Sequence, residues 1–540
     1  MKPMKKLIAL ALLVPLFLFG RKFYDDDPLQ KEPPPLPVDN AVPRKMNDFF
    51  DVVMNTLGHP GERHNQASGE QRFISAGAVN TLGEVPDSAW FTNRIGSRAM
   101  TGEEVARGPR NGNAPSAEGP WVITAAKTEG VTPGFFIKDS AGRRYLLKFD
   151  PPDHPEMATG AEMVGTAVFH SLGYNVPENY LVAFTRGRLV IGQDTIITDD
   201  TGRERPLKES DVDRALRRVP RDEQGRYRGL ASFFIPGKLL DEFRYHGTRA
   251  DDPNDIVRHE HRRDLRGLFV FAAWVNHNDS RAINTKDSLV EEDGVQFIQH
   301  YLIDFGATLG SASVLSNSAR DGNTYFFDAK QTVAQILSLG LYVPAWARST
   351  YVKHPALGLI EYPRFEPEAW KPNYPNPAFV NRLPDDTYWA AKKVMSFTDE
   401  QIRAIVKEAQ YSDPDAEKWI ITYLTHRRDI IGQTYFSKLL PLDAFQVDGG
   451  KLAFEDLQIK YGFGKERNYQ VAWSRFDNST EALTPLQGES GFTLPAAVAH
   501  GENGAYFAAL IHAEDKAKTV TVYLRKKQDK LEVVGIDRTW

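Results

Sequence analysis

The chain has 540 residues, of which 41% are hydrophobic and 25% charged, the composition of a soluble globular protein with roughly two to four domains. Lysine and arginine number 66 and aspartate and glutamate 71, so the net charge of −5 excludes a polycation that would hold nucleic acid over its whole surface. Cysteine is absent, which excludes disulfides, thiolate nucleophiles, cysteine-bound zinc and iron–sulfur clusters. We therefore expect a multidomain globular protein with no nucleic-acid partner.

Residues 1–20 predict an export signal or a membrane anchor. Lys5 and Lys6 precede an apolar run over residues 7–20, which is shorter than the roughly 20 residues of a membrane-spanning helix. No clean cleavage site follows, so the run is either a signal peptide or an uncut anchor that attaches the chain to the membrane. The two lysines favour an N-terminus inside the cell, so we expect an exported protein, periplasmic or facing outward from the cytoplasmic membrane. A buried core helix is the competing interpretation.

Two segments precede the main domain. Residues 21–45 are acidic and then proline-rich, which is the composition of a stiff linker. Residues 46–120 mix short apolar runs with clusters of glycine, asparagine and proline. This pattern indicates an N-terminal extension that packs on the main domain rather than a domain that folds alone.

The main domain is expected over residues 121–440, with a β-rich part up to about residue 250 and a mainly helical part after it. In the first part, strands are predicted at residues 135–139, 145–149, 179–184 and 189–197, and a helix at residues 155–172, before Gly173. In the second part, helical patterns cover residues 256–274, the capping box at residues 398–401 and the amphipathic run at residues 415–436. Short strands at residues 288–290 and 295–303 flank a turn at residues 291–294.

The last hundred residues have a different pattern. Strand-like runs separated by turns occupy residues 469–476, 505–511, 519–524 and 531–536. This predicts a separate β-rich domain over residues 441–540, of the antiparallel sandwich type. The fold class expected for the whole chain is therefore α+β.

Two short motifs, separated by the strand–turn–strand pattern, indicate phosphoryl transfer. Residues 277–284 read H-N-D-S-R-A-I-N, and residues 304–306 read D-F-G. Asp279 can orient a substrate hydroxyl and accept its proton, while Asn284 and Asp304 offer the hard oxygen ligands that Mg²⁺ or Mn²⁺ takes on a triphosphate. By average composition, both motifs in this order arise by chance on the order of once in ten thousand such chains. A solvated loop carboxylate and a turn-forming aspartate are the competing interpretations.

Two residues upstream complete the pattern. Lys148 closes an apolar strand, from which a lysine can reach the α- and β-phosphates, and Glu162 lies in the next helix, where it can pair with Lys148. Glu156 is the alternative partner, but it stands in the first helical turn, where the helix dipole already favours an acid. A surface lysine and a helix-face glutamate are the competing interpretation.

A helix and the turn that follows it resemble the corresponding segment of divergent bacterial and lipid kinases. The segment reads Glu162-Met-Val-Gly-Thr-Ala-Val-Phe-His-Ser-Leu-Gly-Tyr-Asn-Val-Pro177. Together with the two motifs, residues 121–436 resemble a protein-kinase-like fold, of the atypical branch that includes phosphatidylinositol 3-/4-kinases and HipA-like kinases. The resemblance implies a small β-rich lobe and a helical lobe with ATP between them. It also implies a catalytic loop that contains His277 and Asp279, phosphate contacts from Lys148, and a metal held by Asn284 and Asp304.

The sequence departs from this family pattern in three places. Glu129-Gly-Val-Thr-Pro-Gly134 lacks the G-x-G-x-x-G form, which leaves Gly130 and Gly134 as the candidate phosphate-loop residues. Asn278 replaces the usual arginine of the catalytic loop, and no A-P-E segment follows the D-F-G motif. These departures weaken the inference of a substrate class from the family more than the inference of its fold.

Other features have simpler interpretations. His259 and His261 lie two residues apart and so face different sides of a helix, unlike the i, i+4 pair of a zinc site. The neighbouring Arg262, Arg263 and Arg266 are expected on a solvated helix face, with a docking site for an anionic substrate as the alternative. No G-x-S-x-G elbow or P-loop is present, so a serine hydrolase and a Walker-type NTPase lack support.

The sequence thus predicts an exported, ATP- and Mg²⁺-dependent phosphotransferase that acts on a hydroxyl of an unidentified protein, lipid or sugar. The alternative is a catalytically weak, pseudokinase-type scaffold whose β-rich domain binds a glycan or a protein. Nucleotidyl transfer on the same fold, such as AMP transfer to a protein, is a third interpretation.

Overall fold

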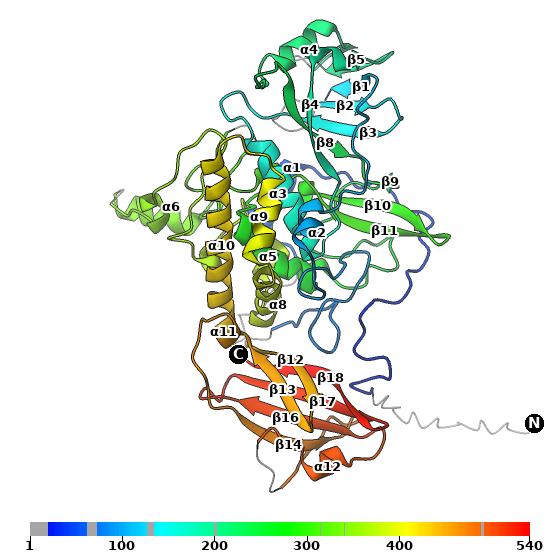
Figure 1. Ribbon diagram of the computed structural model, residues 1–540, viewed down its shortest axis with the longest axis vertical. Coiled ribbons are helices and arrows are strands. Elements are labelled where there is room, and N and C mark those ends of the chain that lie inside the picture. The colour runs from blue at the N-terminus through cyan, green and yellow to red at the C-terminus, as the bar shows by residue number, and fades with distance from the viewer. Residues whose placement is uncertain are drawn as a thin grey trace, which may run out of the picture. The chain divides into compact units, whose positions relative to one another are not determined.

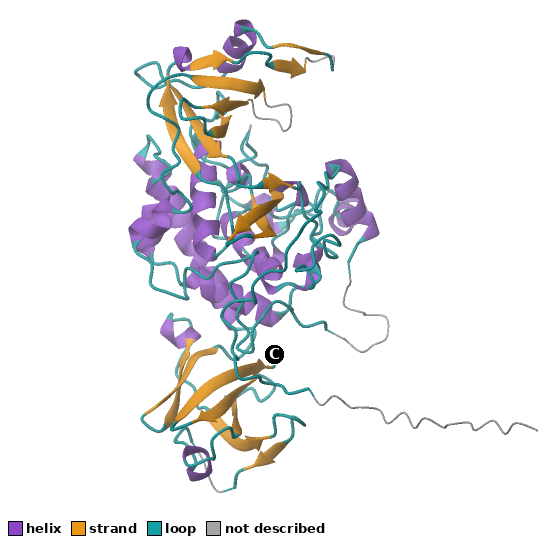
Figure 2. Ribbon diagram, turned by 90° about the vertical axis from the view of Figure 1, so that its right-hand side faces the viewer, coloured by secondary structure: helices purple, strands orange, loops and turns teal. Residues whose placement is uncertain are grey.

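The computed structural model describes residues 20–61, 73–126, 134–198, 202–313, 315–339, 341–487 and 491–540. The fold is mixed α and β with several separate sheets (Figures 1 and 2). The chain forms two compact units: Leu29–Pro441 with Asp456–Glu466 and Trp540 make the larger one, and the described residues up to Pro28, Leu442–Glu455 and Arg467–Thr539 make the smaller one. The apolar run predicted as a signal or anchor lies outside the described residues, apart from Gly20. Within the described ranges, no helix is long and apolar enough to span a membrane.

A six-stranded sheet forms the β-rich part of the larger unit, in the order β4-β8-β3-β2-β1-β5. Its neighbouring strands run antiparallel, except for the parallel pair β1 and β5. The strands are β1 (Trp121–Ala126), β2 (Gly134–Lys138), β3 (Arg144–Lys148), β4 (Asn179–Phe184), β5 (Leu189–Ile191) and β8 (Tyr227–Phe233). A two-stranded ribbon, β6 (Ile196–Thr198) with β7 (Glu204–Pro206), and the helix α4 (Glu209–Leu216) complete this part.

Alternation along β3 decides which side chains leave the core of this sheet. Tyr145 and Leu147 are buried in a hydrophobic cluster with Phe135, Ile137 and residues of α4. Because successive side chains of a strand point to opposite faces, Lys148 leaves this core on the other face. The face that carries Lys148 is therefore free to meet the helical part.

The helix α3 (Met157–Leu172) connects the sheet to the helical part and is buried along nearly its whole length. It ends before Gly173, as predicted, because Gly173 has a φ of +132° and a Cβ there would lie 2.2 Å from the Phe91 ring. Its buried residues join a large hydrophobic cluster that contains Trp274 and the core of the helical part. The helices of this part are α5 (Arg263–Val275), α7 (Pro377–Val380), α8 (Pro384–Met395), α9 (Asp399–Lys407) and α10 (Pro414–Phe436).

Two predictions about this region are wrong. The helix expected from residue 256 begins only at Arg263, because Arg262 takes an extended backbone conformation after a 3₁₀ turn over His259–His261. The three arginines expected on a solvated face are buried and satisfied by carboxylates: Arg262 pairs with Asp264, and both Arg263 and Arg266 pair with Asp386. The capping box at Thr398 is confirmed, and α9 begins directly after it.

A long hairpin links the two sequence motifs. The strands β10 (Thr285–Glu292) and β11 (Val295–Leu302) pair antiparallel from Thr285 opposite Leu302 to Glu292 opposite Val295, and β9 (Lys238–Leu239) pairs with the outer edge of β10. Asp293 and Gly294 both have positive φ, the geometry of a tight hairpin turn. The hairpin is longer than predicted. Because Thr285 pairs with Leu302, the chain is beside Asn284 again just before it reaches Asp304.

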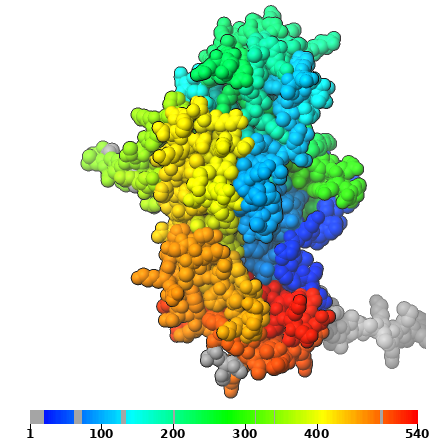
Figure 3. All heavy atoms as spheres, in the orientation of Figure 1, coloured from blue at the N-terminus to red at the C-terminus, as the bar shows by residue number. Residues whose placement is uncertain are grey.

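The segment before residue 120 contacts the larger unit at several points. Val38 and Ala41, in the segment predicted as a linker, are buried with Leu240 and Ile298. Helix α1 (Asp48–Val53) continues into a π-helical turn over Met54–Gly58, and α2 (Gly102–Arg107) packs on α9. The predicted linker is therefore not free of the folded part, because its apolar side chains find buried sites there. By contrast α6 (Ala329–Leu337) has no buried residue and projects from this unit (Figure 3).

The smaller unit contains a five-stranded antiparallel sheet in the order β15-β14-β16-β17-β18 and the hairpin of β12 (Leu442–Asp448) and β13 (Lys451–Asp456). The five strands and the short helix of this unit are β14 (Gln470–Phe476), β15 (Leu483–Pro485), α12 (Ala496–Ala499), β16 (Tyr506–His512), β17 (Thr519–Lys527) and β18 (Lys530–Arg538). Residues 456–466 depart from the predicted domain 441–540. They belong to the larger unit, because Leu457 of α11 (Leu457–Lys460) and Phe463 pack on its hydrophobic core.

Candidate active site

Lys148, Glu162 and Asp304 meet at one point of the larger unit. The Nζ atom of Lys148 lies 2.7 Å from Oδ1 of Asp304 and 3.3 Å from Oε2 of Glu162. The Glu162 side chain is only 3% exposed, whereas that of Asp304 is 43% exposed. Burial lowers the pKa of Lys148, but the two carboxylates outweigh this effect and raise it above its ordinary value. The lysine is thus a charged group that faces one buried and one accessible carboxylate.

Three partners hold the Glu162 carboxylate. Its Oε1 atom accepts hydrogen bonds from the backbone N–H of Phe305 (3.1 Å) and from Nδ2 of Asn179 (3.3 Å), while Oε2 faces Lys148. Burial raises the pKa of Glu162, and the charge of Lys148 opposes this effect. The alternative partner, Glu156, instead accepts a hydrogen bond from the backbone N–H of Ser412. The structure therefore brings Glu162, and not Glu156, to the lysine.

The D-F-G motif forms a left-handed turn at the end of β11. Asp304 has φ 62° and ψ 62°, a region that aspartate adopts more readily than most non-glycine residues. Phe305 is fully buried and stacks on Phe169 of α3 at 4.8 Å between ring centroids. A Cβ on Gly306 would lie 3.1 Å from Oε2 of Glu162, so a larger residue would press on the Glu162 carboxylate. The motif thus anchors its phenylalanine inside and leaves its aspartate accessible.

His277 belongs to this anchor rather than to the accessible part of the site. Its ring lies 5.7 Å from the Phe305 ring and 5.9 Å from the Phe169 ring, between centroids. Burial lowers its pKa, so the imidazole is neutral near pH 7, and its buried Nδ1 atom has no hydrogen-bond partner among the described residues. This placement differs from the catalytic position predicted from the motif, because the apolar rings enclose the imidazole.

Asp279 is held by amide and guanidinium donors. Its Oδ2 accepts a hydrogen bond from Nδ2 of Asn284 and its Oδ1 one from Nδ2 of Asn373, both at 2.8 Å. Arg281 makes an ion pair with the same carboxylate. The side chain of Asp279 is still 17% exposed, so one edge of the carboxylate can meet a substrate.

The hairpin brings Asn284 next to the D-F-G motif. The backbone carbonyl of Asn284 accepts a hydrogen bond from the backbone N–H of Ile303 at 3.0 Å, one residue before Asp304. Asn284, at the end of the first motif, thus lies next to the residue that precedes Asp304, at the base of the β10–β11 hairpin. A carboxylate and an amide oxygen suit Mg²⁺ or Mn²⁺, which completes its shell with phosphate oxygens and water. Within the described ranges, no group of three or more histidine, aspartate or glutamate side chains is arranged to hold a metal by itself.

Of the two candidate phosphate-loop glycines, the structure describes one. Gly134 is the first residue of β2 and lies directly opposite Lys148 of β3 in the sheet register. Its backbone is therefore next to the lysine that is expected to contact phosphates. Gly130 lies outside the described residues.

Three polar residues of the site were not predicted from the sequence. Arg281 stands inside the first motif at a position to which no role was assigned, and Nη1 of Arg281 contacts both carboxylate oxygens of Asp48 at 3.0 Å. Asp48 is the first residue of α1, and Asn373 lies in a loop of the helical part. For Arg281 a signal existed, since it is a basic residue two positions after Asp279. For Asp48 and Asn373, no pattern in the neighbouring sequence indicates a contact with the site.

No protein-family model and no curated protein matches this chain. The chain is similar, at a low level, to two solved structures of the Golgi casein kinase. The one described as the crystal structure of the Golgi casein kinase with Mn/ADP bound has 9% sequence identity and a TM-score of 0.27, over 58% of this chain and 72% of that chain. The other has 8% identity and a TM-score of 0.27, over 58% of this chain and 70% of that chain. A likeness at this TM-score carries no argument about fold or function.

Proposed function

We propose that the chain is a kinase-like phosphotransferase that uses ATP and Mg²⁺ or Mn²⁺ to phosphorylate a hydroxyl-bearing acceptor. The observation that supports this best is the contact of the Lys148 ammonium with both Glu162 and Asp304. The three residues come from a strand, a helix and the end of a hairpin. Phosphoryl transfer is mostly positioning and charge neutralisation, and it needs a cation and a metal-binding carboxylate next to each other.

Each residue of the site has a separate task in this proposal. Lys148 contacts phosphate oxygens, and Glu162 orients the lysine. Asp304 and Asn284 are the residues that would hold the metal ion, which neutralises charge on the triphosphate when it is bound. Gly134, beside Lys148, lets the backbone approach the phosphates, and the same role is proposed for Gly130.

The transfer step uses Asp279 as the base. Asp279 orients the acceptor hydroxyl and accepts its proton while the acceptor oxygen forms a bond to the γ-phosphorus. The bond between the γ-phosphorus and the bridging oxygen breaks, and ADP leaves with the electron pair. Asn284 and Asn373 keep the carboxylate in one orientation through their hydrogen bonds. His277 positions the D-F-G motif by packing on Phe305, so we assign it a positioning role rather than a catalytic one.

The proposal extends to the organisation of the chain. We propose a small lobe over residues 121–250 and a helical lobe over residues 251–440; the separate hydrophobic cluster of the sheet and α4 supports the first, although α3 packs in the cluster of the second. For Leu442–Glu455 and Arg467–Thr539 we propose a sandwich-like module that binds a glycan or a protein, supported by the five-stranded sheet and the β12–β13 hairpin. Export to the periplasm, or attachment to the outer face of the cytoplasmic membrane, is supported by the basic and apolar residues 1–20.

A pseudokinase-type scaffold is the second candidate. It is favoured by the ion pair between Lys148 and Asp304, because this contact engages a proposed metal ligand. It is also favoured by the missing G-x-G-x-x-G pattern near Gly130 and Gly134. A scaffold, however, has no chemical need for Asp279 with its two amide donors.

Metal-dependent ATP binding and ADP release distinguish the two candidates, with water as the acceptor in the second assay. Asp304→Asn should weaken Mg²⁺-dependent ATP binding by about tenfold or more, because it removes a charged metal ligand. Asp279→Asn should keep ATP binding and lower ADP release by about 100-fold or more, because it removes the base. Asp153→Asn, the same change at an exposed residue between β3 and α3, is the control and should alter neither.

Two outcomes would contradict the proposal. If Asp279→Asn releases ADP as fast as the unchanged protein, Asp279 is not the base. If the unchanged protein produces no heat of binding with millimolar ATP and Mg²⁺, the scaffold is the better description.

A further inference from the structure

A cavity of about 600 Å³ lies in the larger unit, separate from the contact between Lys148 and Asp304. Its walls are residues 44–46, 60–61, 242–244, 246–249 and 258–259, together with Asp287 of β10. Five lysine or arginine residues line it against two carboxylates, Glu242 and Asp287. The five are Arg44, Lys45, Arg244, Arg249 and Arg258. Three of these cations already pair with carboxylates: Arg44 with Asp251, Arg249 with Asp251 and Asp287, and Arg258 with Glu260.

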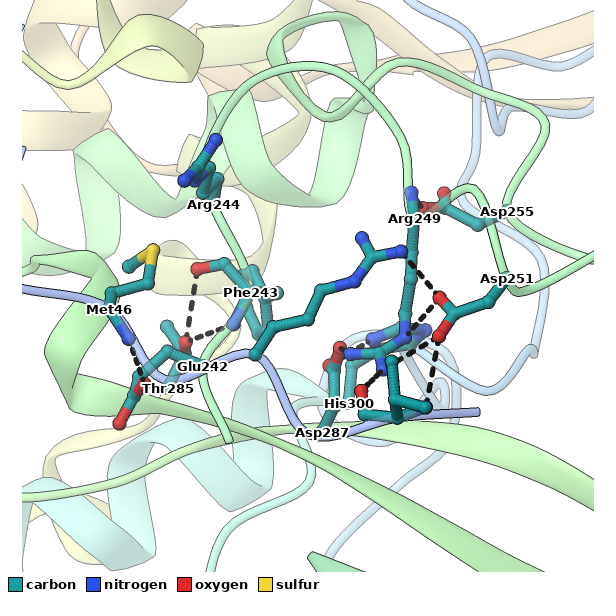
Figure 4. Close-up of polar contacts among 12 residues, drawn as sticks. Met46, Glu242, Phe243, Arg244, Arg249, Asp251, Asp255, Thr285, Asp287 and His300 are labelled. Carbon is teal, nitrogen blue, oxygen red and sulfur yellow. Dashed lines mark hydrogen bonds and ion pairs between the residues drawn. The ribbon is translucent and has the colours of Figure 1, made fainter. Parts of the chain in front are cut away.

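Ion pairs within the wall already satisfy its carboxylates (Figure 4). Arg249, only 3% exposed, contacts Oδ2 of Asp287 at 2.9 Å and Oδ1 of Asp251 at 3.1 Å, and Arg44 contacts the same Oδ1 of Asp251 at 2.6 Å. Glu242 accepts a hydrogen bond from the backbone N–H of Met46 at 3.1 Å and forms an ion pair with Lys286. These carboxylates are therefore not available to neutralise a further cation.

Arg244 is that further cation. Its side chain is exposed, makes no hydrogen bond or ion pair with the described residues, and stands apart from the contacts of Arg249, Asp251 and Asp287 (Figure 4). Its backbone, in contrast, is held: His259 contacts its carbonyl oxygen, and the neighbouring Phe243 N–H donates to Oγ1 of Thr285 at 3.0 Å. A guanidinium on an anchored backbone is well suited to bind a phosphate through two parallel hydrogen bonds.

The cavity adjoins the catalytic loop. Arg244 and His246 also line a second, small cavity, whose walls include Arg281 and Tyr374. Arg281 makes an ion pair with Asp279, the proposed base. An anion bound at Arg244 is thus one layer of side chains away from the carboxylate that would accept the proton of the acceptor.

We propose that this cavity binds the phosphate of the acceptor and that the acceptor is a small phosphorylated molecule with free hydroxyls, of the size of a sugar phosphate. The inference rests on the proposed function, since it adds the acceptor class to that reaction. A volume of about 600 Å³ is in the range of pockets that enclose small molecules rather than protein segments. The uncompensated charge of Arg244 selects an anion, and its planar guanidinium matches the geometry of a phosphate.

Isothermal titration with defined probes tests the inference on the full chain. The probes are inorganic phosphate, glucose 6-phosphate, myo-inositol 1-phosphate, and the parent compounds glucose and myo-inositol. At least one phosphate ester should bind about tenfold more tightly than its parent compound and than inorganic phosphate, because both the phosphate and the hydroxyls are recognised. Arg244→Glu should abolish this preference.

Two variants serve as controls for that titration. Arg403→Glu makes the same charge reversal at an exposed position of α9 and should bind the ester as the unchanged protein does. Asp304→Asn removes the proposed metal ligand at a more exposed position and should also keep ester binding. If Arg244→Glu retains ester binding, or if Asp304→Asn loses it, the cavity is not the phosphate site and the inference is wrong. Esters that bind no better than inorganic phosphate would overturn the acceptor assignment.

The transfer assay separates failure of this inference from failure of the proposed function. With the bound ester as acceptor, Arg244→Glu should raise the KM for the ester about tenfold and leave the KM for ATP unchanged. Transfer to the ester with an unchanged KM in Arg244→Glu would overturn the acceptor site while the phosphotransferase activity stands. Ester binding that depends on Arg244 in a protein that transfers no phosphate would contradict the proposed function, and with it the acceptor role of the cavity.

Discussion

Lys148 is a largely buried cation whose charge depends on two carboxylates. Its side chain is 15% exposed, and burial alone would lower its pKa, but Asp304 and Glu162 raise it. Removing one partner from a buried ion pair typically costs about 3–5 kcal/mol, because the remaining charge is left without compensation. Glu162 is therefore a residue whose loss would harm the fold as well as the orientation of the lysine. Asp304 and Asp279 are more exposed, so their replacement by asparagine should change function with less effect on the fold.

The stability of the protein in acid should depend on His170, on α3. Burial, together with the charges of Arg94 and Arg107, lowers the pKa of His170 from 6.5 to about 3. Between these two values the unfolded chain binds a proton at His170 that the folded chain does not, so the free energy of unfolding falls as the pH falls. His170→Gln removes this effect. The urea midpoint of the variant should therefore decline less between pH 6.5 and pH 4 than that of the unchanged protein.

The range above pH 8 provides an internal control for this comparison. The imidazole is neutral there in both the folded and the unfolded chain, so the two urea midpoints should run parallel. Curves that run parallel below pH 6.5 as well would show that His170 takes up a proton in the folded protein as readily as in the unfolded chain.

Among the elements, α1 reaches the loop that carries Asp279 from a distant part of the chain. Its first residue, Asp48, contacts Arg281 at 3.0 Å, and Arg281 pairs with Asp279. Asp48→Asn removes the second carboxylate that shares the guanidinium. Arg281 then acts on Asp279 alone and makes it a weaker base, so ADP release should fall by about threefold to tenfold with unchanged ATP binding.

The control for α1 is a carboxylate in the same N-terminal segment. Asp39 is exposed, and Asp39→Asn makes the identical change without touching the catalytic loop. Because Asp48 itself is 40% exposed, its replacement should change the free energy of unfolding by less than about 1 kcal/mol. ADP release by Asp48→Asn that equals that of Asp39→Asn would show that α1 does not act on Asp279.

On the scale of the whole molecule, the smaller unit is closed by a residue from the other end of the chain. Phe23 is 1% exposed and packs in that unit against Phe476 and Tyr523, with ring centroids 5.8 Å and 5.1 Å away. A Cβ on Gly535 would lie 2.4 Å from the Phe23 ring, so this glycine leaves room for it. The segment predicted as a linker thus completes a hydrophobic core.

Phe23→Ala should therefore destabilise the smaller unit by about 3–5 kcal/mol, the usual result of removing a buried phenylalanine ring. Hydrogen exchange followed by mass spectrometry measures the effect, and protection should fall in β14 and β16–β18. Phe49→Ala is the matched control, because Phe49 is 77% exposed and its loss leaves no cavity. Equal protection of these strands in Phe23→Ala and Phe49→Ala would contradict the buried role of Phe23.

The sequence by itself determined the features that neighbouring residues control. The end of α3 at Gly173 and the start of α9 at Thr398 follow from local rules, because a positive φ and a capping hydroxyl are properties of a few adjacent residues. For the same reason, the motifs at residues 277–284 and 304–306 could be placed on either side of a hairpin. The residues between them have the local strand–turn–strand pattern that predicts one. The direction of the Lys148 side chain, away from the buried Tyr145 and Leu147, follows from the alternation of side chains along β3.

Only the tertiary structure decided which distant residues meet. It brought Asn373 to donate a hydrogen bond to Asp279, and Asp48 to form an ion pair with Arg281. It also left Arg244 without an ion-pair partner in the part of the chain that the structure describes. It also placed His277 among aromatic rings, and buried the arginines that a helical pattern had put on the surface. Such contacts depend on how all elements pack together, because a side chain that is polar in the sequence is buried wherever the fold supplies a compensating charge.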